Sequence, residues 1–559
     1  MERPINDLDT ILAEIGQFGM LQTLNFILIC FPMVYSGMEL NYFFTASGVE
    51  QRCRIDECDP EDTTAPAFLP LWIDNSVPFE SGVPSKCTRY KLSNSKDTST
   101  SYIDNNSKNS NSSPFCPGNM FDQTATESCS EFIYKTEEKT IATEWGLSCP
   151  NDAWKLAAIG TLHNFGQLIG VPTGGYVSDR YGRRKVLALA GTLGASMSII
   201  QSFSINYAMF AVFEVLSAAF WCTVYPTVMV LALELVRPTK RPLFTCILTA
   251  FYPLGAVAMG VVAKHVPNWR HFLRFLFIPG LLHIIYFWII SESIRWLLAK
   301  GRYDVAIRDL KKAANFNKTP LSEESIEKFS LYCELHKETS RRVSGKSYPI
   351  RHAFTSRKLF WRISICSFCW FAIFLNYYGL SLNSVSLVGN KHLNFILVSL
   401  MEGPASLVFY FAANSMGRRS SQSCFLIASG VACLSSYLVN NNHPWLAFAL
   451  YLFGKLAASA SLINMVVYTS ELFPTNLRQS LFSFCAMFGQ IGSMIAPQTP
   501  LLAQTFPSLP LIIFGSCGIA SGLLVLKFPE TSDVTLPMTV DDAENVGNDV
   551  TETTETENI

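Results

Sequence analysis

The chain alternates long apolar runs with short polar connections over most of its 559 residues. A transmembrane helix needs roughly 20 predominantly apolar residues, and membrane helices tolerate the Gly and Pro that several runs carry. Candidate spans fall near residues 20–45, 153–177, 186–204, 207–235, 244–264, 272–291, 359–381, 393–413, 421–439, 444–470, 480–503 and 508–528. The pattern predicts an all-α membrane protein with twelve transmembrane helices.

Two motifs occur twice at a nearly constant offset. The segment 179–184 (DRYGRR) matches 414–419 (NSMGRR), and 234–241 (ELVRPTKR) matches 471–478 (ELFPTNLR), with corresponding residues 235 to 237 positions apart. Each motif lies between apolar runs, and repeated membrane halves are typical of secondary transporters. The repeat therefore predicts two pseudo-symmetric six-helix bundles.

Composition agrees with a membrane protein, because 16% of residues are charged against about 25% in a soluble domain. The net charge of −1 gives no indication of a nucleic-acid partner. The short connections after even-numbered spans are rich in Arg and Lys, whereas the opposite connections hold few basic residues. The positive-inside rule places the first set in the cytosol, and with them both termini. We expect a multi-pass protein of the plasma membrane.

These boundaries predict a domain organisation. It comprises a cytosolic N-terminus (1–19), an N-terminal six-helix bundle (20–291) containing a long extracellular loop (47–152), a cytosolic central loop (292–358), a C-terminal six-helix bundle (359–528) and a disordered cytosolic tail (529–559). The central loop contains amphipathic patterns at 303–315 and 322–337, which predict short helices.

The long outer loop has the features of an extracellular segment. An even set of cysteines in an oxidising compartment indicates disulfides, although the sequence leaves their pairing open. The loop also carries two sequons for glycosylation, at Asn105 and Asn111. The cysteines are Cys53, Cys58, Cys87, Cys116, Cys129 and Cys149.

Several segments together resemble a known family. Residues 175–184 (GYVSDRYGRR) resemble the signature loop of the major facilitator superfamily. The strings EWGLSC (144–149), ESIRWL (292–297), YYGLSLN (377–383) and YTSELFPTNLR (468–478) are similar to those of its organic cation, anion and zwitterion transporters. The resemblance runs from Gly16 to about Asn545, and it departs at Asn414, where an acid is common, and at Ile294, where Pro is usual. It implies a major facilitator fold and alternating access.

Ionisable residues inside spans are costly and are functional candidates by default. Glu39, Glu214, Glu402 and Lys455 are such residues, whereas we interpret His163 and His283 as hydrogen-bonded helix contacts. Organic cations also bind aromatic faces. In the family that the chain resembles, span eleven typically carries an acid in cation transporters and an arginine in anion and carnitine-type transporters. The matching residue here is Gln490, which is uncharged. The predicted cavity residues are Gln490, Glu402, Lys455, Tyr377, Tyr378, Glu39 and Trp370.

The repeated motifs predict conformational gates on the cytosolic side. An aspartate at a helix end can pair with an arginine of a neighbouring helix, and such a latch must break when the opposite side closes. The predicted gate residues are Asp179, Arg180, Gly182, Arg183, Arg184, Glu234, Arg241, Gly417, Arg418, Glu471 and Arg478.

The resulting hypothesis is a secondary-active or facilitative transporter of small organic ions, with organic cations preferred. Organic anions and carnitine-like zwitterions stay open, as does a non-transporting membrane sensor on the same scaffold. An enzyme would need clustered catalytic residues, whereas the eight histidines are scattered. No phosphate-binding Gly-rich motif of an ATP-driven pump occurs, and we expect no cofactor or metal. The lipid bilayer is the expected surrounding, and the sequence leaves the oligomeric state open.

Overall fold

The computed structural model describes residues 20–59, 67–80, 83–93, 116–235, 241–317, 354, 356–387, 389–439, 443–474, 477–506, 508–532 and 544. The chain divides into two compact units, each with its own internal contacts. The helical unit comprises Met1–Phe43, Ala157–Val266 and Arg270–Ile559. The smaller unit comprises Phe44–Leu156 and Pro267–Trp269.

The helices are long where the sequence has its apolar runs. The first half contains α2 (Met20–Gly37), α3 (Tyr42–Thr45), α6 (Ala153–Tyr181), α7 (Arg183–Gln201), α8 (Tyr207–Leu235), α9 (Arg241–Thr249), α10 (Phe251–His265), α11 (Trp269–Phe277), η3 (Pro279–Ile285) and α12 (Tyr286–Ile289). The second half contains α17 (Arg357–Asn383), η4 (Ser384–Ser386), α18 (Lys391–Leu400), α19 (Glu402–Val439), α20 (Pro444–Leu472), α21 (Arg478–Ile495), η5 (Ala496–Gln498), α22 (Thr499–Thr505) and α23 (Leu509–Val525).

Within the described residues these elements follow the predicted order of twelve spans. Eight segments are long and apolar enough to cross a membrane, and one of them, Lys391–Val439, contains two predicted spans. The remaining three are α23, which is apolar but shorter, and α6 and α7. Polar residues lower the hydropathy of α6 and α7, because α6 contains His163, Asn164 and Gln167, and α7 begins with two arginines and a lysine. The three polar residues of α6 are buried, so the polar side of that span faces protein rather than lipid.

The two repeated motifs share one backbone feature. Gly182, between α6 and α7, has φ = 111°, and Gly417, which divides α19 into two spans, has φ = 77°. Residues other than glycine are strained at such φ angles. Glycine therefore allows the chain to turn sharply at the same position in both halves.

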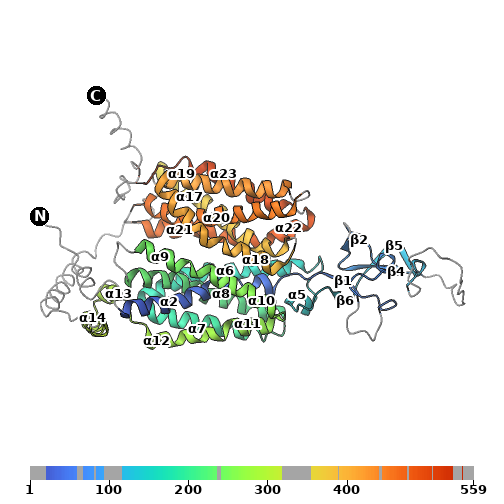
Figure 1. Cartoon of the computed structure of the whole chain (residues 1–559), viewed down its shortest axis with the longest axis horizontal. Coiled ribbons are helices and arrows are strands. Elements are labelled where there is room, and N and C mark those ends of the chain that lie inside the picture. Colours follow the sequence, from blue (N-terminus) through green and yellow to red (C-terminus); the bar gives the residue numbers. More distant parts are fainter. Residues whose placement is uncertain are drawn as a thin grey trace, which may run out of the picture. The chain divides into compact units, whose positions relative to one another are not determined.

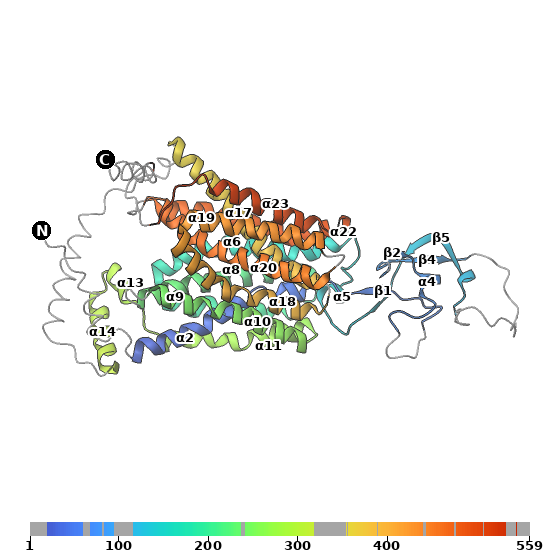
Figure 2. The ribbon, with the colours of Figure 1, turned by 45° about the horizontal axis from the view of Figure 1, so that its top comes forward.

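The helices of each half lie together, the first half in blue to green and the second in yellow to red (Figure 1, Figure 2). The core of the second half contains residues such as Trp370, Met465 and Leu481, from α17, α20 and α21. The halves touch near the ends of their helices, where Thr161 of α6 donates to the carbonyl of Met494 at 2.9 Å. Gln498 donates to the hydroxyl of Thr161 at 2.7 Å.

The central loop contributes two further helices, α13 (Ile294–Ala299) and α14 (Tyr303–Asn317). They share a small core that includes Trp296, Leu297 and Leu310. The amphipathic helix predicted at 303–315 is thus confirmed. The segment 322–337 lies outside the described residues.

The smaller unit is stabilised by disulfides around short antiparallel strand pairs. Its strands are β1 (Gln51–Cys53) with β6 (Phe132–Tyr134), β2 (Phe79–Glu80) with β3 (Val83–Pro84), and β4 (Thr88–Leu92) with β5 (Phe121–Ser128). Its short helices are α4 (Ile73–Ser76), η1 (Gly118–Met120) and α5 (Ile141–Glu144). Disulfides join Cys53 to Cys129, Cys58 to Cys116 and Cys87 to Cys149. The sequons at Asn105 and Asn111 lie outside the described residues.

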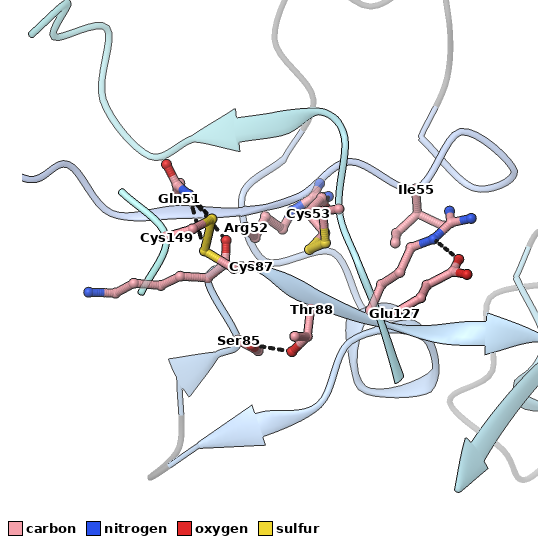
Figure 3. Close-up of a disulfide and its surroundings, with 12 residues drawn as sticks. Gln51, Arg52, Cys53, Ile55, Ser85, Cys87, Thr88, Glu127 and Cys149 are labelled. Atoms are coloured by element: carbon pink, nitrogen blue, oxygen red, sulfur yellow. Dashed lines mark hydrogen bonds and ion pairs between the residues drawn. A yellow bond between two sulfur atoms is a disulfide. The ribbon is translucent and has the colours of Figure 1, made fainter. Parts of the chain in front are cut away.

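Polar contacts support the bridges of this unit. Gln51 lies beside the Cys87–Cys149 disulfide and donates to the carbonyl of Lys86 at 3.2 Å (Figure 3). The fully buried guanidinium of Arg52 pairs with Asp59 at 2.8 Å. Because the disulfides close loops of 58 to 76 residues, they restrict the unfolded chain strongly.

Candidate functional site

A charged cluster lies at the centre of the second half, between α17, α19 and α20. Lys455 of α20 is fully buried, and its ammonium lies 2.9 Å from the carboxylate of Glu402, at the start of α19. Tyr377 of α17 donates to the same carboxylate at 2.7 Å. Lys455 also donates to the hydroxyl of Ser381 at 2.7 Å, and it lies 3.4 Å from the ring centroid of Tyr377. We call Glu402, Lys455, Tyr377 and Ser381 the lysine–glutamate cluster.

The two charges of this cluster differ in accessibility. The Lys455 side chain is 0% exposed, whereas that of Glu402 is 14% exposed. A buried ammonium is tolerated only when it is paired and hydrogen-bonded, and the three neighbours of Lys455 meet that need. Glu402 also lies in the first turn of a helix, where the backbone dipole favours a carboxylate. Glu402 is therefore the more exposed of the two charges.

The other predicted cavity residues lie in different surroundings. Tyr378 is half-buried and packs edge-on against Tyr377, with 5.2 Å between ring centroids. Trp370 is buried in the core of the second half and donates to Thr469 at 3.1 Å. Gln490 of α21 is half-buried, and its side-chain oxygen accepts a hydrogen bond from Ser493 at 3.3 Å. The structure thus brings Tyr377, Tyr378, Glu402 and Lys455 together, and the cavity roles of these four residues, like those of Trp370, Gln490 and Glu39, stay predictions.

Glu39 belongs to a second polar group, in the first half. Gln167 of α6 donates to the Glu39 carboxylate at 3.1 Å and lies 3.3 Å from Nε2 of His163. The other ring nitrogen of His163 lies 2.7 Å from the carboxylate of Glu214, in α8. Gln201 of α7 donates to the second oxygen of Glu214 at 2.5 Å. We call these five residues the acid–histidine network.

The first gate motif forms a network of ion pairs and hydrogen bonds. Arg183 pairs with Asp179 at the end of α6, and its guanidinium lies 3.6 Å from Glu234 of α8. The carboxylate of Glu292 accepts hydrogen bonds from the backbone nitrogens of Arg183 and Arg184 at 2.9 and 3.2 Å. Arg180 donates to Tyr176. The side chain of Arg241 lies outside the described residues.

The second gate motif repeats the same geometry. Arg418 lies 3.3 Å from Glu471 of α20, as Arg183 lies near Glu234. The carboxylate of Glu530 accepts from the backbone nitrogens of Arg418 and Arg419 at 2.8 and 3.1 Å. Here an exposed asparagine, Asn414, stands where the first motif has its aspartate. Among the described residues, the guanidinium of Arg183 therefore contacts two carboxylates and that of Arg418 contacts one.

The sequence interpretation missed several of these partners. Glu292 and Glu530 follow spans six and twelve at matching positions, 238 residues apart, so the repeat itself could have indicated both. Gln167, Gln201 and Ser381 carry no comparable signal, because a polar residue in a helix does not disclose its partner on another helix. Two nitrogens of Arg478 are buried without a hydrogen-bond partner among the described residues. In that same part of the chain, no group of three or more His, Cys, Asp or Glu side chains could hold a metal ion.

The repeated gates, the two six-span halves and the buried charges near their centres define a membrane transporter of the major facilitator fold. Residues 100–539 match the family described as "Sugar (and other) transporter", and the chain belongs to that family. The chain is therefore a multi-pass transporter of small organic solutes and not an enzyme.

Similar proteins narrow the relationship. The chain is 28% identical to an organic cation transporter-like protein of Drosophila melanogaster, over 96% of this chain and 93% of the relative. It is 29% identical to organic cation/carnitine transporter 2 of Mus musculus, over 96% and 94%. The inward-open xylose transporter XylE of E. coli has a TM-score of 0.54 at 17% identity, over 71% of this chain and 90% of that one, which supports the fold alone. The resemblance to organic cation and carnitine transporters and the fold class are confirmed.

Proposed function

We propose that the chain carries small organic cations across the membrane by alternating access, and that the Glu402 carboxylate binds their cationic group. The observation that supports this most directly is a partly exposed carboxylate that accepts a hydrogen bond from Tyr377, whose ring packs edge-on against Tyr378. Carboxylates and aromatic faces both attract organic cations. The organic cation transporters among the similar proteins support the same substrate class.

Substrate binding has a direct route to conformational change in this cluster. A cation that approaches Glu402 competes with Lys455 for the same carboxylate. Because Lys455 is fully buried on α20 and Glu402 begins α19, weakening their pair alters the contact between two helices. A ligand shifts an equilibrium only through different affinities for the two states, and this competition supplies such a difference.

Lys455 supports a second candidate, a carnitine-like zwitterion. Its ammonium can pair with the carboxylate of such a substrate while Glu402 pairs with the substrate's quaternary nitrogen. The two candidates differ in competition experiments. A zwitterion carrier is inhibited by carnitine more strongly than by tetraethylammonium, and a cation carrier shows the reverse order.

The test is uptake of labelled tetraethylammonium, carnitine and an aromatic carboxylate into proteoliposomes. We expect tetraethylammonium uptake to be saturable and to disappear in the double variant Glu402→Gln/Lys455→Met, which removes both charges together so that neither is left unpaired. Glu50→Gln, an exposed acid of the outer unit paired with Lys135, is the matched control and should transport normally. Binding without flux would instead indicate a sensor, and normal uptake by the double variant would refute the role of Glu402.

We also propose a plasma-membrane location with both termini in the cytosol. The uneven distribution of basic residues and the disulfide-linked outer unit support this orientation. Terminal epitope tags should react with antibody only in permeabilised cells, and Asn105→Gln should increase electrophoretic mobility by removing a glycan. Labelling of intact cells at both tags would contradict the orientation.

A further inference from the structure

A cavity lined by basic side chains lies beside the first gate, between the start of α7 and the helices α13 and α14. Its volume is about 460 Å³, which is within the usual range of small-molecule sites. We call this cavity the basic pocket. Its lining contains two acidic side chains, Glu292 and Asp309. The basic side chains outnumber them, and they are Arg184, Lys185, Arg302, Arg308 and Lys312.

One face of α14 forms a wall of the basic pocket. The lining residues of this helix are Val305, Arg308, Asp309 and Lys312. They recur at intervals of three and four residues, which places them along one side of the helix. A neighbouring side packs into the small core that α14 shares with α13. The amide oxygen of Asn317 accepts from the backbone nitrogen of Leu21 at 2.9 Å, so the end of α14 is joined to the start of α2 (Figure 2).

The two acids of the basic pocket do not neutralise its cations. The carboxylate of Glu292 accepts from two backbone nitrogens at the start of α7. The carboxylate of Asp309 lies 3.8 Å from Arg308. Cations of three chain segments therefore face one cavity with an excess of positive charge. The lining cations that form no ion pair within the described part of the chain are Lys185, Arg302 and Lys312.

The basic pocket adjoins the end of a lipid-facing helix. The guanidinium of Arg184 donates to the carbonyl of Ile290, the residue that follows α12, at 3.3 Å. On α12, Trp288 is 74% exposed, and Tyr181 in the pocket lining is 54% exposed. Exposed Trp and Tyr side chains are typical of the boundary between membrane and water. The pocket therefore lies at the level of lipid headgroups.

We propose that the basic pocket binds the headgroup of a multiply phosphorylated inositol lipid. Arginine binds phosphate through paired N–H groups and lysine binds it as a point charge. Several phosphates on one ring can contact the start of α7 and the wall formed by α14 at the same time. Basic pockets between membrane helices on the cytoplasmic side bind headgroups of this kind. The proposal does not depend on which solute the transporter carries.

The basic pocket shares two residues with the first gate. Glu292 lines the pocket and holds the start of α7, and Trp296 lines it and donates to the carbonyl of Asp179 at 2.9 Å. A headgroup that joins Lys185 of α7 to Lys312 of α14 therefore stabilises the arrangement in which these gate contacts are formed. A ligand that binds one conformation better than another shifts the equilibrium toward it. We expect the bound lipid to lower turnover.

The repeat does not reproduce this arrangement within the described residues. Glu530 accepts from backbone nitrogens at the second gate, as Glu292 does at the first. Helices α13 and α14 follow Glu292, whereas the described residues after Glu530 contain no helix of comparable length. The lipid is therefore expected to act on the first gate.

The first experiment measures binding to the full chain in detergent, with a short-chain phosphatidylinositol bisphosphate as the probe. The variant Lys185→Gln/Lys312→Gln removes one exposed cation from each wall of the pocket. It should weaken binding about fivefold for each charge, or about 25-fold in total. The matched control Lys300→Gln/Lys311→Gln removes two exposed lysines that do not line the pocket. Equal weakening by the two double variants would overturn the site.

Competitors identify the chemistry of the ligand. Inositol trisphosphate should displace the probe, because it carries the same phosphates, but it should bind more weakly because it has no lipid chains. Phosphatidylserine should not displace the probe at the same concentration, since it has a single phosphate. Equal displacement by phosphatidylserine would mean a general attraction of anionic lipids and would refute a phosphoinositide site. Tighter binding of inositol trisphosphate than of the probe would show that the ligand is a soluble phosphate anion and not a lipid.

Uptake of labelled tetraethylammonium measures the consequence for the gate, and this measurement alone rests on the proposed function. Phosphatidylinositol bisphosphate in the proteoliposome membrane should lower the initial rate about fivefold, at the lower end of usual conformational coupling. The control Lys300→Gln/Lys311→Gln should respond in the same way, and Lys185→Gln/Lys312→Gln should respond little. Binding of the lipid without any change in uptake would contradict the link to the gate. If tetraethylammonium is not transported, the proposed substrate class fails, and the binding measurements still decide the pocket.

Discussion

The lysine–glutamate cluster and the acid–histidine network contain different chemistry in two halves of a repeated fold. In the second half, Lys455 and Glu402 balance each other at 2.9 Å. In the first half, Glu214 bonds the imidazole of His163 directly at 2.7 Å, and Glu39 is connected to that imidazole only through Gln167. The comparison shows that the second half buries a lysine paired with a glutamate, whereas the first half connects two glutamates and a histidine through hydrogen bonds.

The gates show the opposite relation. Arg183 and Arg418 each contact a glutamate of the fourth span of their half, and Glu292 and Glu530 each accept from two backbone nitrogens of the loop. The repeat has thus kept its chemistry at the gates and lost it between the central clusters.

The largest expected effect is on stability in the second half. Glu402→Gln leaves Lys455 fully buried without a carboxylate, and breaking a buried pair in this way costs about 3–5 kcal/mol. Lys455→Met should cost less, because Glu402 keeps some exposure to water. The double variant should recover most of the loss. Thermal unfolding in detergent measures this order, and equal destabilisation by the two single variants would contradict it.

The same acid-to-amide change in the first half should cost less. Glu214→Gln replaces one of two accepting oxygens by an NH2 donor but leaves no lysine unpaired, so we expect a loss of about 1–3 kcal/mol. Thermal unfolding of Glu214→Gln beside Glu402→Gln makes the comparison direct. A loss as large as that of Glu402→Gln would mean that His163 is charged and that the network is an ion pair.

The two gate arginines should differ in their effect on turnover, because the first motif has Asp179 where the second has Asn414. Arg183→Ala removes contacts with Asp179 and Glu234, and Arg418→Ala removes the contact with Glu471. We expect turnover to fall on the order of tenfold in the first variant and less in the second, within the usual range of conformational coupling. Apparent affinity should change little, because both arginines are remote from the central clusters. Initial rates of uptake, normalised to protein in the membrane, measure both quantities, and the reverse order of the two variants would count against the role of Asp179.

The order of spans could be predicted from the sequence because it is a local property. Each run of about 20 apolar residues specifies its own helix, and the repeated DRYGRR and NSMGRR segments fix where the halves correspond. The polar sides of α6 and α7 make these spans less apolar, and only their position in the repeat identifies them as spans.

The partners of the buried charges are not local. Glu402 and Lys455 were both predicted as cavity residues, but the two residues lie 53 positions apart in sequence and on different helices, so the sequence did not show that they pair. His163 was interpreted as a helix contact, which its bond to Glu214 supports, yet the continuity with Glu39 depends on Gln167. A glutamine in a span carries no charge, and the sequence gives no reason to single it out. Residues that connect charged groups therefore emerged only from the packing of the helices.

The smallest expected effect concerns Gln490, which tests whether the second half can be given a net charge. Gln490→Asp should favour tetraethylammonium over an aromatic carboxylate, and Gln490→Arg should favour the carboxylate. A new charge near the solute is worth roughly 1 kcal/mol, or about fivefold in each direction. The aspartate can still accept the hydrogen bond from Ser493, whereas the arginine cannot, so some loss of total uptake is expected in the second variant only.

Paired uptake of the two probes, expressed as a ratio and normalised to protein in the membrane, separates charge from folding. Opposite shifts in the ratio would place Gln490 beside the solute and make the second half adjustable by one residue. Parallel losses for both probes would mean that the glutamine only supports α21. In that case, among the residues tested in the second half, only the lysine–glutamate cluster would determine which charge of solute is preferred.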